Sequence, residues 1–320
     1  MSDSAVLLLD CPDQKGLIAR VSSLLYQHGA NILHADQHQD HDLGLFFMRV
    51  EWALNGTGNG LPEGEPDCTA LAGAHCPNAA EVKSKAALND RQKGFDLEAF
   101  RSAFAPLAQQ LNMRWQLTSS AHRPPVALFC SRYLHCVADL LYRWRAGELW
   151  CEIPLIVSNH REVERLASFY GIAFAHVPVH AATRAEAEER QIELLEENGI
   201  ELVVLARYMQ ILSPGLIARY PAAIINVHHS FLPAFTGARP YHAAHARGVK
   251  LIGATSHYVT EALDDGPIIE QDVARISHRD QVEDLVARGR DLERMVLSRA
   301  VRWHLNRRIL CYRNKTVVFD

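Results

Sequence analysis

The stretch IPLIVSNHREVERLASFYGIAFAHVPV, residues 153–179, decides the fold of this chain. Its first apolar run predicts a buried strand at residues 153–159, a helix follows as far as Tyr170, and IAFAHVPV predicts a second strand. The apolar runs VALFC, residues 126–130, and ELVVLA, residues 201–206, continue the alternation. Near-continuous apolar strands that alternate with helices favour an α/β fold with a mostly parallel sheet, covered on both faces.

Helix signals complete this part of the chain. Thr183 and Glu186 have the spacing of a capping box, in which the two side chains satisfy backbone N–H groups at a helix start. The helix that they open is expected to reach Asn198, and residues 277–308 are expected to be mostly helical. Sheets of this kind bind ligands beyond the carboxyl ends of their strands, so we expect the functional site there.

The beginning of the chain predicts a smaller domain of another kind. A helix opened by Pro12 and Asp13 has one apolar face and is expected to end at Gly29. A second amphipathic helix is expected at residues 96–111. Strands are expected at residues 5–9, 31–38, 44–52 and 113–117. This order of strand, helix, strand, strand, helix and strand predicts a ferredoxin-like α+β sandwich.

The length of 320 residues suggests two domains. We expect the first at residues 1–118, a linker, SSAHRPP, at residues 119–125, and the second at residues 126–320. The first domain contains an insertion at residues 55–94 that is rich in Gly, Pro and small residues. Its cysteines and histidine match no structural zinc spacing, so no metal site is expected from Cys68, His75 and Cys76.

The composition limits the partners to consider. A formal net charge of −4 and a pI of about 6.5 give no reason to expect nucleic acid or an anionic membrane. No apolar run approaches the roughly 20 residues that span a bilayer, and the N-terminus lacks the basic start of a secretory signal. Seven scattered cysteines fit reduced thiols in a cytoplasmic protein better than a disulfide framework.

The residues that carry chemistry lie between residues 222 and 271. Asn226 and His228 follow the short apolar strand AAII, and their spacing of two places both side chains on one face. His257 lies in the expected strand GATSHYV, and the turn EALDDGP carries Asp264. Taken singly, each residue also fits a plain structural role, since an Asn at a strand end or an Asp-Asp-Gly turn is common for conformational reasons.

As a whole, the pattern resembles the signature of the folate-dependent formyltransferase family: Asn-x-His-x-Ser with a following Leu-Pro, and later His-x₆-Asp-x-Gly-Pro. The first part is NVHHSFLP, residues 226–233, and the second is HYVTEALDDGP, residues 257–267. The resemblance covers about residues 126–308 and implies a Rossmann-like catalytic domain. It implies that Asn226, His228 and Asp264 are catalytic and that His257 holds Asp264 in place.

This resemblance extends to a folate-binding loop. LARYMQILS, residues 205–213, is similar to the strand-end loop that receives the pterin of the folate. Arg207, Met209 and Leu212 are expected to line that pocket, largely through backbone groups. Arg239 lies near the expected site, and two interpretations of it are open. One is contact with the glutamate tail of the folate, and the other is an exposed position without a special role.

The acceptor of the formyl group distinguishes members of this family. Enzymes that formylate a phosphorylated amine have a Gly/Ser-rich loop whose backbone N–H groups hold phosphate. Here FCSRYLHCVAD, residues 129–139, has no glycine and looks like the matching segment of formyltetrahydrofolate deformylases. The resemblance implies hydrolysis of 10-formyltetrahydrofolate to tetrahydrofolate and formate, which would serve purine synthesis, without a cofactor. Formyl transfer to an amine acceptor and a folate-binding regulator without turnover are the alternatives.

A second resemblance concerns the first domain. DCPDQKGLIARVSSLLYQHGANI, residues 10–32, is similar to ACT domains, which are regulatory modules that bind small molecules. Asp13, Gly16 and Asn31 are the positions most similar to an amino-acid effector site, although Asp13 and Gly16 also fit a helix start and Asn31 a strand start. Because ACT domains usually bind ligands between copies, the resemblance implies a homo-oligomer.

Overall fold

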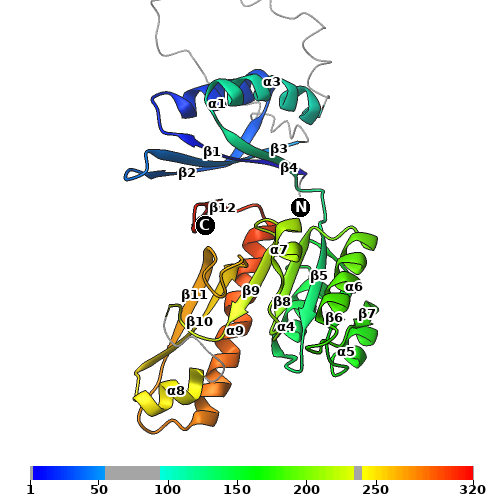
Figure 1. Cartoon of the computed structure of the whole chain (residues 1–320). Helices are drawn as coiled ribbons and strands as arrows, with labels where there is room; N and C mark the ends of the chain where they lie inside the picture. Colours follow the sequence, from blue (N-terminus) through cyan, green and yellow to red (C-terminus); the bar gives the residue numbers. More distant parts are fainter. Residues whose placement is uncertain (1–2, 55–93, 234–239, 320) are drawn as a thin grey trace, which may run out of the picture. The chain divides into compact units, whose positions relative to one another are not determined.

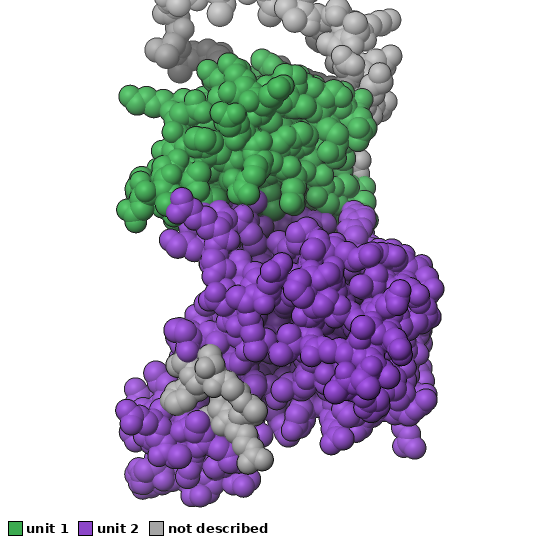
Figure 2. All heavy atoms as spheres, viewed as in Figure 1, with its two compact units in different colours: residues 1–121 green, residues 122–320 purple. Residues whose placement is uncertain are grey.

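The computed structural model describes residues 3–54, 94–233 and 240–319. The chain divides into two compact units, residues 1–121 and residues 122–320, which Figure 2 shows in green and purple. The expected insertion, apart from Gly94, lies outside the described residues. Its Cys68, His75 and Cys76 and the loop residue Arg239 are therefore also outside them.

The first unit is an α+β sandwich with a four-stranded antiparallel sheet of strand order β2-β3-β1-β4 (Figure 1). One hydrophobic core unites residues of β1, β3, α1 and α3. This architecture confirms the ferredoxin-like prediction. In chain order the elements are β1 Ser4–Pro12, α1 Leu17–Gln27, β2 Asn31–Asp40, β3 Leu45–Ala53, α3 Leu97–Gln110 and β4 Arg114–Ser119.

Local sequence signals explain where the two helices of this unit begin and end. Gly16 precedes α1 with a φ of 86°, and Gly29 follows it with a φ of 78°, a conformation that glycine adopts without steric cost. The side chain of Asp96 accepts hydrogen bonds from the backbone N–H groups of Glu98 and Ala99 at the start of α3.

The second unit contains a seven-stranded sheet of order β11-β10-β9-β8-β5-β6-β7. The strands from β9 to β7 pair in parallel, whereas β10 is antiparallel to both of its neighbours. The mostly parallel sheet confirms the sequence-based prediction. In chain order the elements are β5 Pro125–Cys130, α4 His135–Arg145, β6 Glu152–Ser158, α5 Glu164–Tyr170, β7 Ala173–His176, α6 Arg184–Glu197, β8 Leu202–Ala206, α7 Pro214–Arg219, β9 Ile224–His228, α8 Pro240–Arg247, β10 Leu251–Tyr258, β11 Ile268–Arg275, α9 Val282–Leu305, β12 Ile309–Tyr312 and β13 Lys315–Val318.

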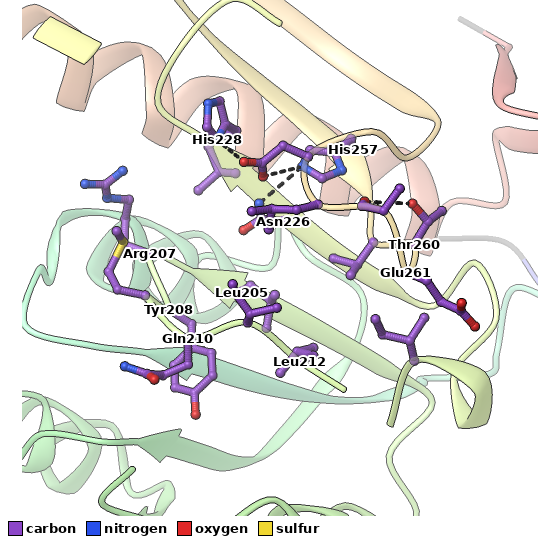
Figure 3. A pocket seen from close by; sticks show the side chains of 18 of the residues that line it. Leu205, Arg207, Tyr208, Gln210, Leu212, Asn226, His228, His257, Thr260 and Glu261 are labelled. Carbon is purple, nitrogen blue, oxygen red and sulfur yellow. Dashed lines mark hydrogen bonds and ion pairs between the residues drawn. The ribbon is translucent and has the colours of Figure 1, made fainter. Parts of the chain in front are cut away.

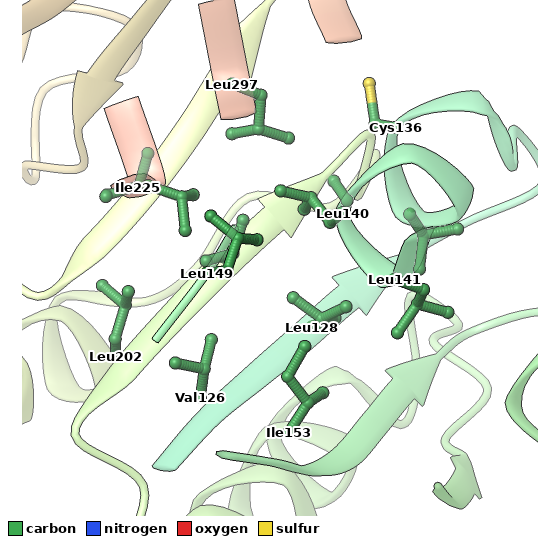
Figure 4. Packing of buried hydrophobic residues seen from close by; sticks show 14 of the residues in the cluster. Val126, Leu128, Cys136, Leu140, Leu141, Leu149, Ile153, Leu202, Ile225 and Leu297 are labelled. Carbon is green, nitrogen blue, oxygen red and sulfur yellow. The ribbon is translucent and has the colours of Figure 1, made fainter. Parts of the chain in front are cut away.

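Helices cover both faces of this sheet because its central strands are apolar on both sides. On one face, Val126 and Leu128 of β5 pack with residues of α4, α5 and α9, as Figure 4 shows in part. On the other face, Ala127 and Phe129 pack with residues of α6 and α7. The alternation of consecutive β5 residues between two cores is the period of two expected for a strand.

Some local predictions were wrong or incomplete. No capping box forms between Thr183 and Glu186, since the Thr183 side chain makes no cap hydrogen bond at the start of α6. A capping box instead joins Gln281 and Asp284 at the start of α9. The strand β11 at residues 268–275 was not predicted. None of the described helices has the length and apolar character needed to cross a membrane.

Gly266 lies in the turn between β10 and β11, where a side chain has no room. A Cβ atom at this position would lie 1.8 Å from the carbonyl oxygen of Tyr258. We expect Gly266→Ala to lower the free energy of unfolding by about 3 kcal/mol, because the backbone must move to relieve the overlap. Gly215→Ala is the control, since its Cβ would meet only Ser213 Oγ, at 3.4 Å. Equal denaturant midpoints for the two variants would contradict this expectation.

Candidate active site

The two parts of the motif meet across neighbouring strands at one end of the sheet. Asn226 and His228 occupy the carboxyl end of β9, as expected. The antiparallel strand β10 places His257 directly opposite Asn226. The turn after β10 then returns Asp264 to the same place, so all four side chains come together (Figure 3).

Short contacts join these four side chains into one connected group. The Nδ1 of His228 lies 3.2 Å from Oδ2 of Asp264, and the Nε2 of His257 lies 3.7 Å from Oδ1. His257 donates from Nδ1 to the carbonyl oxygen of Tyr258 at 2.9 Å, which leaves Nε2 to accept from Asn226 Nδ2 at 3.2 Å. Asp264 thus touches both histidines, and His257 touches both Asp264 and Asn226.

The electrostatics of this group keep Asp264 ionised. The hydrogen bond from His228 holds the pKa of its carboxyl well below the usual range, although partial burial acts in the opposite direction. Because Nδ1 of His228 faces Asp264, the other ring nitrogen, Nε2, is available for chemistry. This Nε2 is buried without a hydrogen-bond partner among the described residues.

Asp264 has a left-handed backbone with a φ of 54°. A non-glycine residue in this region costs about 1–2 kcal/mol, and such strain gathers at functional sites, where the surrounding structure holds it in place. Gly266, two residues later, fits closely under the backbone of Tyr258. The backbone geometry of this turn therefore explains the glycine of the Asp-x-Gly part of the motif, since no side chain fits at position 266.

A cavity of about 450 Å³ lies beside these residues, beyond the carboxyl ends of β8 and β9. Arg207, Met209 and Leu212 line it, and the expectation that this cavity receives the folate stays a prediction. The backbone N–H of Arg207 donates to Leu205 O at 3.1 Å, and that of Met209 donates to Ser131 Oγ at 3.1 Å. Any backbone contact of these two residues with a ligand must therefore use their carbonyl groups.

The side chain of Arg207 belongs to a second polar group that the sequence did not predict. Glu293 of α9 is 1% exposed, and its carboxylate accepts hydrogen bonds from His135 Nε2 at 2.7 Å and Tyr241 Oη at 2.8 Å. Arg207 Nε lies 3.4 Å from Glu293 Oε2. We call His135, Arg207, Tyr241 and Glu293 the Glu293 cluster.

Burial would raise the pKa of the Glu293 carboxyl, but the hydrogen bond from His135 and the charge of Arg207 outweigh it and lower the pKa. Cys136 lies close enough that one atom each of His135, Cys136 and Glu293 falls within 4.8 Å of the others. Burial raises the pKa of the Cys136 thiol, and Arg207 brings a positive charge, so both features oppose a cation. The expectation of no metal site stays a prediction.

The expected effector residues do not lie together within one chain. Asp13 and Gly16 share the loop between β1 and α1, and Gln39 Nε2 donates to the Asp13 carboxylate. Asn31 of β2, however, pairs with Ala53 of β3, and Ala53 also pairs with Ser4 of β1. Asn31 is therefore level with Ser4, at the opposite end of β1 from Asp13. Asn31 can join Asp13 and Gly16 only if it comes from a second copy.

Comparison with known families defines the class of this chain. The formyl transferase model matches residues 125–301, and the ACT domain model matches residues 5–51. The fold and the site thus define a formyltransferase-type catalytic domain that follows an ACT domain. The formyltetrahydrofolate deformylase of Synechocystis sp. is 48% identical over 99% of this chain and 98% of its own length. That of Bacillus subtilis is 44% identical over 99% and 94%. The chain belongs to the formyltetrahydrofolate deformylase family.

Solved structures agree with this assignment. A formyltetrahydrofolate deformylase from Pseudomonas syringae pv. tomato is 44% identical, with a TM-score of 0.87 over 100% of this chain and 95% of its own. Glycinamide ribonucleotide transformylase 1 from Symbiobacterium toebii is 28% identical, with a TM-score of 0.58 over 62% of this chain and 95% of its own. The resemblances stated from the sequence are therefore confirmed at the level of family and fold.

His229 provides a test of the electrostatics around the cavity. Burial, followed by the charges of Arg207 and His228, lowers the pKa of His229 to about 4. An unfolded histidine binds its proton near pH 6.5, so the unfolded state gains protons first and the fold loses stability as pH falls from about 6.5 to about 4. We expect His229→Gln to lose less stability than wild type over this window in pH-dependent thermal unfolding. Replacement of the exposed His242 is the control, and an unchanged pH dependence in His229→Gln would contradict the expectation.

Proposed function

We propose that this protein hydrolyses 10-formyltetrahydrofolate to tetrahydrofolate and formate. The observation that carries the proposal is the pair of His228 and Asp264 beside the cavity, with Nε2 of His228 unpartnered among the described residues. Proteins 38–48% identical over nearly the whole chain bear the name of this activity. A hydrolase of this type needs no nucleophilic side chain, because water attacks the formyl carbon directly.

In the first step, His228 Nε2 accepts a proton from a water molecule while the water oxygen bonds to the formyl carbon. Asp264 remains ionised and holds the imidazole through Nδ1, which stabilises the positive charge that forms on His228. The formyl oxygen becomes negative. Asn226 uses one amide N–H toward His257, and its second N–H stabilises this oxygen.

In the second step, the C–N bond breaks and formic acid leaves, which becomes formate when its hydroxyl proton passes to solvent. The protonated Nε2 of His228 returns its proton to the folate nitrogen, which becomes the amine of tetrahydrofolate. We assign the proton transfer to His228 and not to Asp264, because the low pKa of Asp264 makes its carboxylate a weak base. His257 acts as a positioning residue, since it is buried and contacts both Asn226 and Asp264.

We propose that the folate enters along the loop of residues 205–213. Leu212 and the aliphatic part of Met209 offer apolar surface for the pterin, and the carbonyl groups of this loop are its hydrogen-bond acceptors. The reaction uses water and the folate alone, so the proposal includes no cofactor. Formyl transfer to an amine remains the alternative activity, and a folate-binding regulator without turnover is the alternative from another class.

The setting of the reaction is part of the proposal. None of the five described cysteines, Cys11, Cys130, Cys136, Cys151 and Cys311, is in a disulfide bond, which supports a reducing compartment such as the cytoplasm. Formate released there is a one-carbon source for purine synthesis. We also propose that the ACT domain binds an amino acid between two copies, with Asp13 and Gly16 from one copy and Asn31 from the other, in a homo-oligomer.

The role of Asp264 predicts the effect of a neutral isostere. Asp264→Asn should lower kcat by about 10²–10⁴-fold, because the amide cannot stabilise the imidazolium of His228. Folate affinity should change little, since the rest of the cavity is intact. The measurement is formate release in the absence of any amine, with folate binding followed by fluorescence.

His257→Ala is the comparison variant and should lose less activity than Asp264→Asn, because it acts only through its neighbours. Wild-type turnover in Asp264→Asn would remove Asp264 from the mechanism. If wild-type enzyme bound the folate and released no formate without an amine, the hydrolase proposal would fail, and formyl transfer or regulation without turnover would replace it.

The effector proposal predicts a separation of regulation from chemistry. A Cβ at Gly16 meets no atom within 4 Å, but the φ of 86° disfavours any other residue. Gly16→Asp should change the response of kcat or KM to added glycine or methionine and leave the activity without effector within about twofold. If Gly16→Asp instead lowered the activity without effector as much as it changed the response to effector, Gly16 would be needed for folding and not for regulation.

A further inference from the structure

The Glu293 cluster stands where this class of sheet binds ligands. Arg207 follows the last residue of β8, and His135 begins the helix that follows β5, so both lie beyond the carboxyl ends of parallel strands. Arg207 also lines the cavity that contains His228 and His229. Arg207 is therefore the member of the cluster that reaches the active-site cavity.

Arg207 holds its place against its own backbone preference. Its φ of 62° lies in the left-handed region that favours glycine. The side chain is nevertheless fixed, since Glu293 pairs with the guanidinium and the Tyr133 ring centroid lies 5.3 Å from its Cζ. A strained arginine with a buried counter-ion indicates that the side chain, and not only the loop backbone, is needed at this position.

The buried carboxylate of Glu293 has two basic partners, His135 and Arg207. Among the described side chains, His135 and Tyr241 donate hydrogen bonds to Glu293, and Arg207 supplies a charge that its guanidinium always carries. Tyr241 reaches Glu293 only because residue 289 is glycine, since a Cβ there would lie 2.0 Å from Tyr241 Oη. Residues of α4, α8 and α9 thus hold the guanidinium of Arg207 at the cavity wall.

We propose that Arg207, held by Glu293 and Tyr133, is a specificity-determining residue that fills the acceptor side of the cavity and restricts the formyl acceptor to water. The transformylase from Symbiobacterium toebii shares the catalytic fold and, by its name, acts on glycinamide ribonucleotide, which is far larger than water. In this chain Arg207 and His228 line the same cavity, and the charge of Arg207 acts on the neighbouring His229. The inference rests on the proposed hydrolysis and adds the residue that selects the acceptor.

The proposal predicts that a shortened side chain admits an amine. In Arg207→Gly, which also relieves the backbone strain, a primary amine such as glycinamide attacks the formyl carbon. The C–N bond to the folate breaks, a new amide C–N bond forms, and one amine proton passes to the folate nitrogen. Arg207→Asn is the second variant, because Asn tolerates the left-handed region and is also short.

The experiment incubates each enzyme with 10-formyltetrahydrofolate labelled with ¹³C in the formyl group and with glycinamide. NMR then measures the ratio of N-formylglycinamide to formate. We expect this ratio to rise by about tenfold or more in both short variants. Arg207→Met, which fills similar space without charge, should remain near wild type. Arg132→Ala removes an exposed arginine of the same region and is the control.

Each outcome separates this inference from the proposed function. If wild type releases no formate, the hydrolase proposal fails. If the ratio of N-formylglycinamide to formate is the same in wild type and in the short variants, Arg207 does not select the acceptor. If the short variants fold and bind the folate but form neither product, Arg207 belongs to the chemistry, and the selection proposal is again overturned. A ratio that rises equally in Arg207→Met would show that charge, and not volume, excludes the amine, which also contradicts the proposal.

Discussion

The antiparallel pairing of β10 with β9 is the constraint on which the rest of the site depends. Because β10 is antiparallel to β9, it passes the carboxyl end of β9 at Thr255, opposite His228, and continues toward the amino end of β9. The reversal places His257 opposite Asn226 and lets the following turn return Asp264 to His228. Two halves of a motif that are about thirty residues apart thus form one hydrogen-bonded group. A cavity of about 450 Å³ opens on the β8 side of that group.

The sequence predicted those parts of the structure that depend on local patterns. Apolar runs such as VALFC alternate between two cores, and their order along the chain specifies the parallel centre of the sheet. The spacing of Asn226 and His228 correctly predicted a shared face because strand geometry has a period of two. The family resemblance predicted a folate-binding loop at residues 205–213, and the structure shows that residues of this loop line the cavity.

Contacts between distant segments could not be predicted in the same way. His135 and Glu293 are separated by 158 positions, and neither residue carries a local signal that points to the other. The capping box at Thr183 had the right residue spacing but did not form, since Thr183, with φ −117° and ψ 18°, lacks the extended backbone typical of an N-cap and makes no cap hydrogen bond. Likewise, only the strand register shows that Asn31 lies at the opposite end of β1 from Asp13.

The glycine at position 289 has a consequence for how such an enzyme can evolve. Gly289, Tyr241, Glu293 and Arg207 form a series in which each residue needs the next one: the glycine makes room for the tyrosine, and the buried carboxylate needs the arginine. A lineage that exchanged water for a larger acceptor could not lose one charge alone without leaving the other buried and uncompensated. The exchange would therefore require coupled substitutions, and the order in which they arose would be constrained by stability at every step.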